Sequence, residues 1–284
     1  IADLLTPQTP AYYEVWLDGE KAVTTEEDPA VIAARKGGRV STDFETSIEP
    51  IYNTYYLPRK FKCAVTVPGD NSVDAYTQDI TFVVILDDNN ELQGFNVMAG
   101  GGMGRTHNKS ETFARVADLI GYVDKEDVYD LAKAIVFTQR DYGERFNRRL
   151  ARMKYLVHEW GLPKFIAEVE KRFGKKLQPY KELPEWKFED YLGWHEQGDG
   201  KLFVGVHVRN GRVHNRGKLR NKAALKEIVK TYNLSMRVTP NHSVILCDIE
   251  PKDKAAIQAI LDRDGITPDS KVDALERYAM ACPA

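Results

Sequence analysis

The stretch Met98-Ala99-Gly100-Gly101-Gly102-Met103-Gly104-Arg105-Thr106-His107 is the most informative run of this chain. Consecutive glycines let a backbone approach a flat or bulky ligand closely. Two basic clusters flank the run in sequence, Leu57–Lys62 upstream and Arg148–Tyr155 downstream. Because cations on either side can hold negative groups, the three motifs together indicate a polyanionic ligand rather than a generic loop.

The totals describe a globular protein whose positive charge is local. The chain has 284 residues, enough for about two domains and a sizeable core. Hydrophobic residues make up 43% and the formal net charge is −2, which argues against a general nucleic-acid binder. No run of roughly 18 apolar residues exists, so we expect no membrane span. Three widely spaced cysteines fit a reducing compartment rather than a disulfide framework.

The first half predicts strands followed by helices. A short strand at Tyr12–Leu17 ends in a turn at Asp18–Glu20, and a polar connector follows up to Pro50. Apolar residues alternate from Phe61 to Val67, which predicts a strand. Extending this period backwards places Arg59 on the inward face, where a charge needs an anionic partner. Further expected elements are a hairpin of Thr81–Leu86 and Gly94–Met98, a helix capped by Ser110 with apolar Phe113, Val116, Ala117 and Ile120, and helices over about 125–141, 144–160 and 163–173.

The second half, after Pro179–Pro184, predicts an α+β unit that begins with Trp186–Trp194. Its elements alternate as strand, helix, strand, strand and helix, an order that resembles a ferredoxin-like half. They are Leu202–Val208, Ala223–Tyr232, Met236–Val238, Val244–Ile249 and Asp253–Asp262. Cys63 and Cys247 fall on apolar strand positions, so we expect both in the core. The fold class of the whole chain is therefore predicted as α+β.

Six motifs in a fixed order carry a family resemblance over most of the chain. They are Tyr56–Lys62, Gly94–Asn96 leading into the glycine run, Thr138–Asp141, Arg152–Tyr155, Arg237–Asn241 and Met280–Pro283. With these motifs the chain resembles the haemoprotein of assimilatory sulfite reductase, within the sulfite and nitrite reductase family. The segment Tyr191–Gly200 is more similar to the ferredoxin-dependent plant and cyanobacterial branch than to the NADPH-linked bacterial branch.

The resemblance implies an oxidoreductase of sulfur assimilation that reduces sulfite to sulfide with six electrons. In that family sulfite binds the iron of sirohaem, a tetrapyrrole with several carboxylates, and a cysteine-ligated [4Fe-4S] cluster passes electrons to it. Ferredoxin is the implied electron donor, and neither nucleic acid nor a membrane is required. The implied compartment is the cytoplasm or a plastid stroma.

The resemblance also implies a sirohaem-binding α/β domain followed by a ferredoxin-like half-domain. The expected boundaries are 1–50 for a connector from a missing N-terminal region, 51–178 for the first sirohaem-binding repeat, 185–263 for the ferredoxin-like repeat, and 264–284 for the start of a truncated cluster-binding repeat.

Site residues follow from the resemblance position by position. Arg59, Arg152 and Lys154 are expected to act on the substrate, the last two as cations that flank the bound anion. Because positions two apart lie on opposed sides of a helix, either the helix breaks there or the long side chains wrap to one pocket. The expected cofactor-binding residues are Lys62, Gly100, Gly101, Gly102, Arg105, His107, Lys222, Arg237 and Asn241.

Simpler roles compete with several of these assignments. Arg59 also suits a salt bridge at a strand start, and the downstream basic cluster suits a solvated face, which we expect for Arg145, Arg148 and Arg149. His107 suits an N-cap or a packing role. Lys62 lies on the opposite strand face from Arg59, and the match at Lys222 is loose. The motif after Arg237 usually continues Gln-Asn, whereas this chain has His242-Ser243, which puts the polar contacts there in doubt.

Cys282 matches the first of four cluster ligands in the family. The second ligand should follow six residues later, but the sequence given stops at Ala284. We therefore expect a fragment that lacks the N-terminal part and the C-terminal cluster-binding part, and that is inactive alone.

The leading hypothesis is thus a part of a sulfite reductase. Nitrite reductase of the same family is the nearest alternative, because framework and cofactors are shared. A non-catalytic tetrapyrrole- or anion-binding module is a third possibility if the chain truly ends here. A plain α+β interaction domain leaves Arg59 and the glycine run unexplained.

Overall fold

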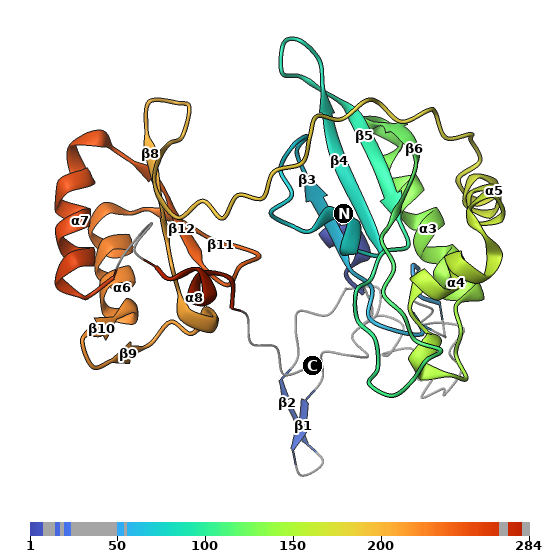
Figure 1. The fold of residues 1–284 in the computed structure, drawn as a ribbon, viewed down its shortest axis with the longest axis horizontal. Helices are drawn as coiled ribbons and strands as arrows, with labels where there is room; N and C mark the ends of the chain where they lie inside the picture. Colours follow the sequence, from blue (N-terminus) through green and yellow to red (C-terminus); the bar gives the residue numbers. More distant parts are fainter. Residues whose placement is uncertain (8–14, 18–19, 24–49, 54–55, 267–271, 280–284) are drawn as a thin grey trace. The chain divides into compact units, whose positions relative to one another are not determined.

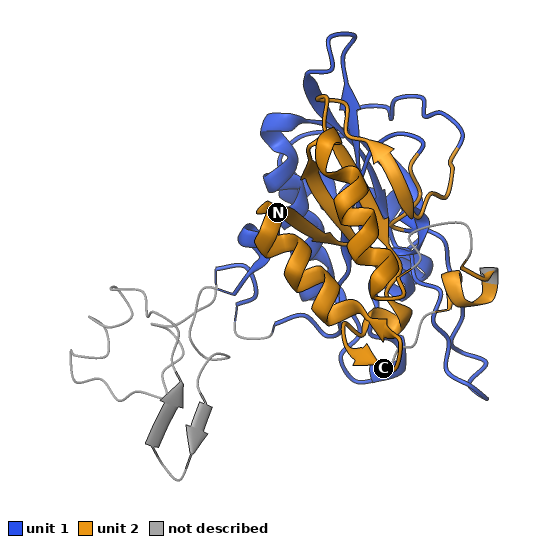
Figure 2. Ribbon diagram, turned by 90° about the vertical axis from the view of Figure 1, so that its left-hand side faces the viewer, with its two compact units in different colours: residues 1–69, 74–185 blue, residues 70–73, 186–284 orange. Residues whose placement is uncertain are grey.

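The computed structural model of the chain describes residues 1–7, 15–17, 20–23, 50–53, 56–266 and 272–279. It divides into two compact units, residues 1–69 with 74–185 and residues 70–73 with 186–284 (Figure 2). We describe each unit by itself. No helix among the described residues has the length and apolar character needed to cross a membrane.

Unit 1 is built on a four-stranded sheet in the order β3-β4-β5-β6 (Figure 1). Its strands are β3 (Cys63–Thr66), β4 (Ile80–Leu86), β5 (Leu92–Ala99) and β6 (Asp118–Asp124). Strand β3 runs parallel to β4, whereas β4 with β5 and β5 with β6 are antiparallel. The predicted hairpin of β4 and β5 is therefore confirmed, with its acidic turn closed by hydrogen bonds to the Asp87 carboxylate.

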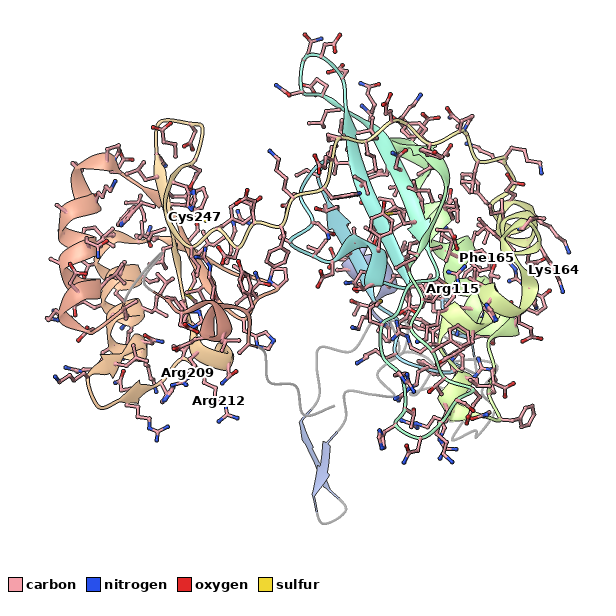
Figure 3. All side chains as sticks on the ribbon, viewed as in Figure 1. Arg115, Lys164, Phe165, Arg209, Arg212 and Cys247 are labelled. Carbon is pink, nitrogen blue, oxygen red and sulfur yellow. The ribbon has the colours of Figure 1, made fainter. Side chains whose placement is uncertain are left out.

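Three helices pack against this sheet and bury its core. They are α3 (Val128–Tyr142), α4 (Met153–Trp160) and α5 (Leu162–Phe173). The core joins strand residues such as Phe82 and Val97 to Leu131 of α3, Val157 of α4 and Phe165 of α5. Figure 3 shows Phe165 pointing inward while its neighbour Lys164 points away, as expected of an amphipathic helix. A short helix α1 (Ala2–Leu5) precedes the sheet, and Ile1 and Leu4 pack on the same core.

Unit 2 has a four-stranded antiparallel sheet in the order β11-β12-β8-β7. The strands are β7 (Gly193–Glu196), β8 (Leu202–Val206), β11 (Ser235–Val238) and β12 (Val244–Ile249). Helices α6 (Asn221–Tyr232) and α7 (Lys254–Arg263) bury a second core against it. A small hairpin of β9 (Asn215–Arg216) and β10 (Leu219–Arg220) precedes α6, and the helix α8 (Ala274–Tyr278) comes last. This is the predicted ferredoxin-like order.

A further hairpin lies in the predicted connector. Strand β1 (Val15–Leu17) pairs with β2 (Glu20–Val23) in antiparallel register, so a strand ending at Leu17 is confirmed. The remainder of the predicted strand, the turn at residues 18–19 and most of the connector lie outside the described residues.

The helix predicted from Ser110 is wrong. Residues 110–117 contain no helix, and β6 follows them. Gly121 has φ +151°, which a helix cannot contain. The Thr112 hydroxyl donates to the carbonyl oxygen of Lys109 and so closes a turn at the place where the helix was expected to begin. The apolar positions from Phe113 to Ile120 thus belong to a loop and a strand, because a short apolar run fits both periods.

The helix predicted over 144–160 is interrupted. A 3-10 helix at Arg148–Leu150 is followed by α4, which begins at Met153 with Arg152 as its N-cap residue. Of the two possibilities left open by the spacing of Arg152 and Lys154, the break is the one observed.

The predicted facing of the first strand is also wrong. Thr66 is buried on β3, whereas Cys63, Val65 and Val67 are exposed. Arg59 precedes the strand and is exposed rather than inward. The alternation of a strand was extended back to Arg59, but β3 begins only at Cys63. Residues outside a strand do not alternate between its two faces. Of the two cysteines expected in the core, Cys247 is buried and Cys63 is not.

Candidate functional site

Arg152 meets the glycine run through a buried carboxylate. Its Nη2 and Nε atoms donate to the two oxygens of Asp79 at 2.8 and 3.2 Å, and Nη2 also lies 3.4 Å from the carbonyl oxygen of Gly101. Asp79 is fully buried. Burial raises the pKa of the Asp79 carboxyl, although the charge and hydrogen bonds of Arg152 oppose the rise. Arg152 is thus held at the N-terminus of α4 in a fixed orientation.

Lys154 lies beside Arg152 but has a different environment. The side chain is 1% exposed, and its Nζ donates to the carbonyl oxygens of Gly102 at 3.0 Å, of Gly104 at 2.7 Å and of Phe113. An ammonium group has three hydrogens, so all of them are used by backbone. Burial lowers the pKa of Lys154, the charge of Arg152 lowers it further, and Asp79 raises it. In this structure Lys154 stabilises the loop, and its contact with the substrate stays a prediction.

Gly100–Gly102 pack closely on the segment that precedes β4. The amide of Gly100 donates to the carbonyl oxygen of Asp79, and that of Gly101 donates to Gln78. A Cβ atom on Gly101 would lie 2.3 Å from the carbonyl oxygen of Tyr76, and Gly100 has φ +83°. The opposite side of the loop is fixed by Arg115, labelled in Figure 3, whose Nη1 donates to the carbonyl oxygen of Gly100 at 2.8 Å. These glycines are therefore needed for backbone contact inside unit 1, and a contact with a macrocycle stays a prediction.

The continuation of the run is open to solvent. Gly104, Arg105 and His107 are exposed, and a Cβ atom on Gly104 would meet no atom within 4 Å. No helix begins near His107, so the alternative of an N-cap is not what the structure has. The cofactor-binding roles of Arg105 and His107 stay predictions.

The upstream basic cluster lines a hollow of about 500 Å³. Its walls combine the cations Arg59 and Lys60 with aromatic and aliphatic side chains, among them Tyr52, Tyr56 and Phe61. The rings of Tyr52 and Tyr56 stack with centroids 5.6 Å apart. The lining includes neither the glycine run nor Arg152 or Lys154, so the structure does not place all three predicted substrate residues in one pocket. Lys62 has an exposed side chain, and its backbone amide donates to Asp79 at 2.8 Å.

The candidates in unit 2 lie on separate elements. Lys222 is exposed in the first turn of α6, and Asn241 is partly buried in the turn between β11 and β12. Arg237 is exposed on the edge strand β11 and lines a hollow of about 370 Å³ with Tyr191, Phe203 and Cys247. Two further arginines, Arg209 and Arg212, project from the same unit in Figure 3, and both are exposed. Whether any of these residues shares a ligand with unit 1 stays a prediction.

Cys282 lies outside the described residues. Within the part of the chain that the structure describes, no group of three or more His, Cys, Asp or Glu side chains is placed to hold a metal ion. Cys63 and Cys247 belong to different units.

Sequence reasoning missed two residues that organise the site. Asp79 gave no signal, because a single carboxylate before a strand is common. Gln139 belongs to the quoted motif Thr138–Asp141 but received no role. It is 2% exposed and donates from Nε2 to the carbonyl oxygen of Ala151 at 2.9 Å. Gln139 also packs against Gly143, and Gly143 in turn contacts Pro58. Gln139 thus supports the residues just before Arg152 and lies near those just before Arg59.

Two family models match the chain. Residues 1–177 match the model described as "Nitrite and sulphite reductase 4Fe-4S domain". Residues 195–263 match the "Nitrite/Sulfite reductase ferredoxin-like half domain". An α+β chain with this pair of domains belongs to the nitrite and sulfite reductase family.

The relatives agree with this family. A "Sulfite reductase [ferredoxin]" of Synechococcus elongatus is 56% identical over 100% of this chain and 45% of its own length. A "Sulfite reductase [NADPH] hemoprotein beta-component" of a Paenibacillus species is 39% identical over 99% of this chain and 46% of its own. The solved structure of the Mycobacterium tuberculosis NirA protein aligns with a TM-score of 0.66 and 25% identity, and it covers 80% of this chain and 39% of that one. The chain spans about half the length of the curated relatives it matches.

Proposed function

We propose that this chain is part of a sulfite reductase that binds sirohaem and sulfite and receives electrons from ferredoxin, in the cytoplasm or a plastid stroma. The observation that carries the proposal is the meeting of Arg152 with the glycine run, in a chain 56% identical to a ferredoxin-dependent sulfite reductase. The donor is proposed from that same relative.

The residues present fit a flat, polyanionic macrocycle. The hollow lined by Arg59 and Lys60 offers cations beside stacked aromatic rings, and such a surface suits a ring system that carries carboxylates. Arg105 and His107 add exposed polar groups on the loop after the glycines. In the proposal these residues hold the carboxylates, with Lys222, Arg237 and Asn241 as further candidates.

The chemistry at this site needs positive charge more than it needs a nucleophile. Sirohaem, when bound, would supply an iron that can bind sulfite and pass electrons to it. This chain's own residues bind and orient the anion: we assign Arg152 and Arg59 to that task and assign Lys154 to the support of the loop. Fixed guanidinium groups also stabilise charge on oxygens that leave as water.

The cluster requires ligands that this chain does not supply. A [4Fe-4S] cluster of this kind takes four cysteine thiolates, and the chain has three cysteines, two of which are in separate units. We propose Cys282 as one ligand, with the others outside these 284 residues.

The test uses the complete protein in which this chain occurs. Purified protein should carry sirohaem and reduce sulfite to sulfide with reduced ferredoxin, and it should do so faster than with NADPH. Arg152→Ala and Arg59→Ala should each raise the sulfite KM about ten- to a hundredfold, because a charge-assisted contact contributes about 1.5–3 kcal/mol.

The control variant is Arg148→Ala, which removes the same side chain from an exposed position four residues before Arg152. It should leave the KM unchanged. A preference for nitrite over sulfite, or absence of sirohaem in the complete protein, would overturn the proposal.

A further inference from the structure

Strand topology brings three motifs of unit 1 to one carboxylate. Lys62 and Asp79 directly precede the parallel strands β3 and β4, in which Cys63 pairs with Ile80. Strand β5 runs antiparallel to β4 and pairs Ala99 with Ile80, so Gly100 also arrives at Asp79. The upstream basic cluster and the glycine run therefore meet at this residue.

Asp79 contacts all three motifs. One carboxylate oxygen of Asp79 accepts a hydrogen bond from the backbone amide of Lys62 at 2.8 Å. The backbone carbonyl oxygen of Asp79 accepts one from the amide of Gly100 at 2.9 Å. Both carboxylate oxygens accept hydrogen bonds from Arg152. A buried carboxylate without partners would be very unfavourable. The contacts of the Asp79 side chain with Lys62 and Arg152 therefore stabilise its buried position.

The ion pair leaves one end of Arg152 available. Asp79 takes the edge formed by Nε and Nη2, whereas Nη1 makes no hydrogen bond to a described residue. The Arg152 side chain is 17% exposed, against 1% for Asp79. The guanidinium is thus held by its Nε–Nη2 edge, and part of the Arg152 side chain is accessible to solvent.

We propose that Asp79 is a positioning residue that orients Arg152 so that its free Nη1 end faces the anion, and that keeps the backbones of Lys62 and Gly100 in register with it. The identity of the anion as sulfite or a sirohaem carboxylate rests on the proposed function. Asp79 itself touches neither, because it is fully buried.

The substitution Asp79→Asn removes the ion pair and one of its two hydrogen bonds. The oxygen that accepts from Lys62 also accepts from Nη2 of Arg152, and an amide oxygen in its place can still do both. The amide nitrogen replaces the other oxygen, where it is a donor and cannot accept from Nε of Arg152. The variant should therefore loosen the guanidinium and keep the Lys62 contact. Asp79→Glu keeps the charge but moves it by one methylene, and it serves as the second variant if the first does not fold.

The matched control is Asp118, the carboxylate at the first residue of β6. It pairs with Arg115, which holds the carbonyl oxygen of Gly100, and it has no contact with Arg152. Asp118→Asn should lower the thermal midpoint of the complete protein without changing the sulfite KM.

The experiment is a mutant cycle in the complete protein with Asp79→Asn, Arg152→Gln and the double variant. We expect Asp79→Asn to raise the sulfite KM about tenfold and to alter the sirohaem absorption spectrum. In the Arg152→Gln background it should add no further change, because residues that act as one unit are not additive. Asp79→Glu should give an intermediate KM.

Two results would overturn the inference. One is a KM of the double variant that rises by the product of the two single-variant factors. This result would mean that Asp79 acts independently of Arg152. The other is a lowered thermal midpoint with an unchanged KM and spectrum, as expected of a merely structural ion pair. A crystal structure of the Asp79→Asn variant decides the geometry even if the proposed function fails, because the Nε atom of Arg152 should have moved away from residue 79 while the Lys62 contact remains.

Discussion

The Nζ atom of Lys154 and the carbonyl oxygen of Gly102 lie 3.0 Å apart, and this contact joins α4 to the glycine run from inside the protein. Two more carbonyl oxygens complete the coordination of the ammonium, and the ring of Tyr155 lies 4.9 Å from it. Lys154 matches a substrate-contacting residue by its motif, yet its ammonium group donates to three backbone carbonyl oxygens. These contacts should first of all affect folding.

Lys154→Met should destabilise the protein by about 2–4 kcal/mol, because three carbonyl oxygens lose the buried ammonium group that donates to them and the new side chain cannot replace it. Urea unfolding followed by circular dichroism measures the change. Lys171→Met is the control, because its side chain is 78% exposed, and we expect a change below about 0.5 kcal/mol. Equal midpoints for Lys154→Met and the unmodified protein would contradict the role in folding.

Asp141 should give unit 1 a pH-dependent stability. It accepts hydrogen bonds from Arg140 of the same helix and from Arg172 of α5 at 2.6 Å. Burial raises the pKa of Asp141, but these two arginines outweigh burial and hold it below 3.8. Because the folded pKa is the lower one, the stabilisation is present above pH 3.8 and is lost as the pH falls through the folded value.

The measurement compares Asp141→Asn with the unmodified protein. The variant should be less stable at pH 6, and the difference should shrink as the pH falls below 3.8. A difference that stays constant down to the acid transition would show that the carboxylate charge is not what joins α3 to α5.

Tyr191 should make unit 2 sensitive to alkali. Burial and a hydrogen bond of 3.0 Å from its hydroxyl to Asp70 raise the pKa of Tyr191 to about 12. Because the folded pKa is above 10.0, the stabilisation is present below pH 10 and is lost as the pH rises toward 12. The pKa can be measured by ultraviolet titration of the phenolate absorbance. The signal of Tyr191 is the difference between the unmodified protein and the Tyr191→Phe variant. A phenolate signal assigned to Tyr191 near pH 10 would contradict it.

The sequence was sufficient for the elements with a clear period and a clear boundary. Helix α3, the β4–β5 hairpin and the ferredoxin-like order were predicted because their apolar positions and turn residues agree. The region from Ser110 to Ile120 was not, because its short apolar run fits a helix as well as a strand. The positive φ of Gly121 is visible only in the fold.

The site was predictable by residue type but not by contact. The motifs indicated correctly that Arg152 and the glycine run belong together. They did not indicate that Asp79 lies between Arg152 and Lys62, because that contact depends on the parallel pairing of β3 with β4. Nor did they indicate that Lys154 faces inward: the break at Arg152 rotates the two side chains into different surroundings, which spacing along an unbroken helix cannot show.

The glycine run can be divided into a structural and an open part by two matched substitutions. Gly101→Ala should destabilise the protein by about 1–3 kcal/mol or prevent folding, because its Cβ atom would lie 2.3 Å from the Tyr76 carbonyl oxygen and 2.7 Å from that of Gln78. Gly104→Ala meets no atom within 4 Å and should leave the urea midpoint unchanged. Arg105 follows Gly104 and is proposed to hold a sirohaem carboxylate, so a macrocycle bound there would meet the added methyl group. Gly104→Ala should then lower the sirohaem content of the complete protein, measured by its absorbance. Unchanged sirohaem content in a stable Gly104→Ala protein would restrict the run to a structural role, and equal stability losses in both variants would contradict the division itself.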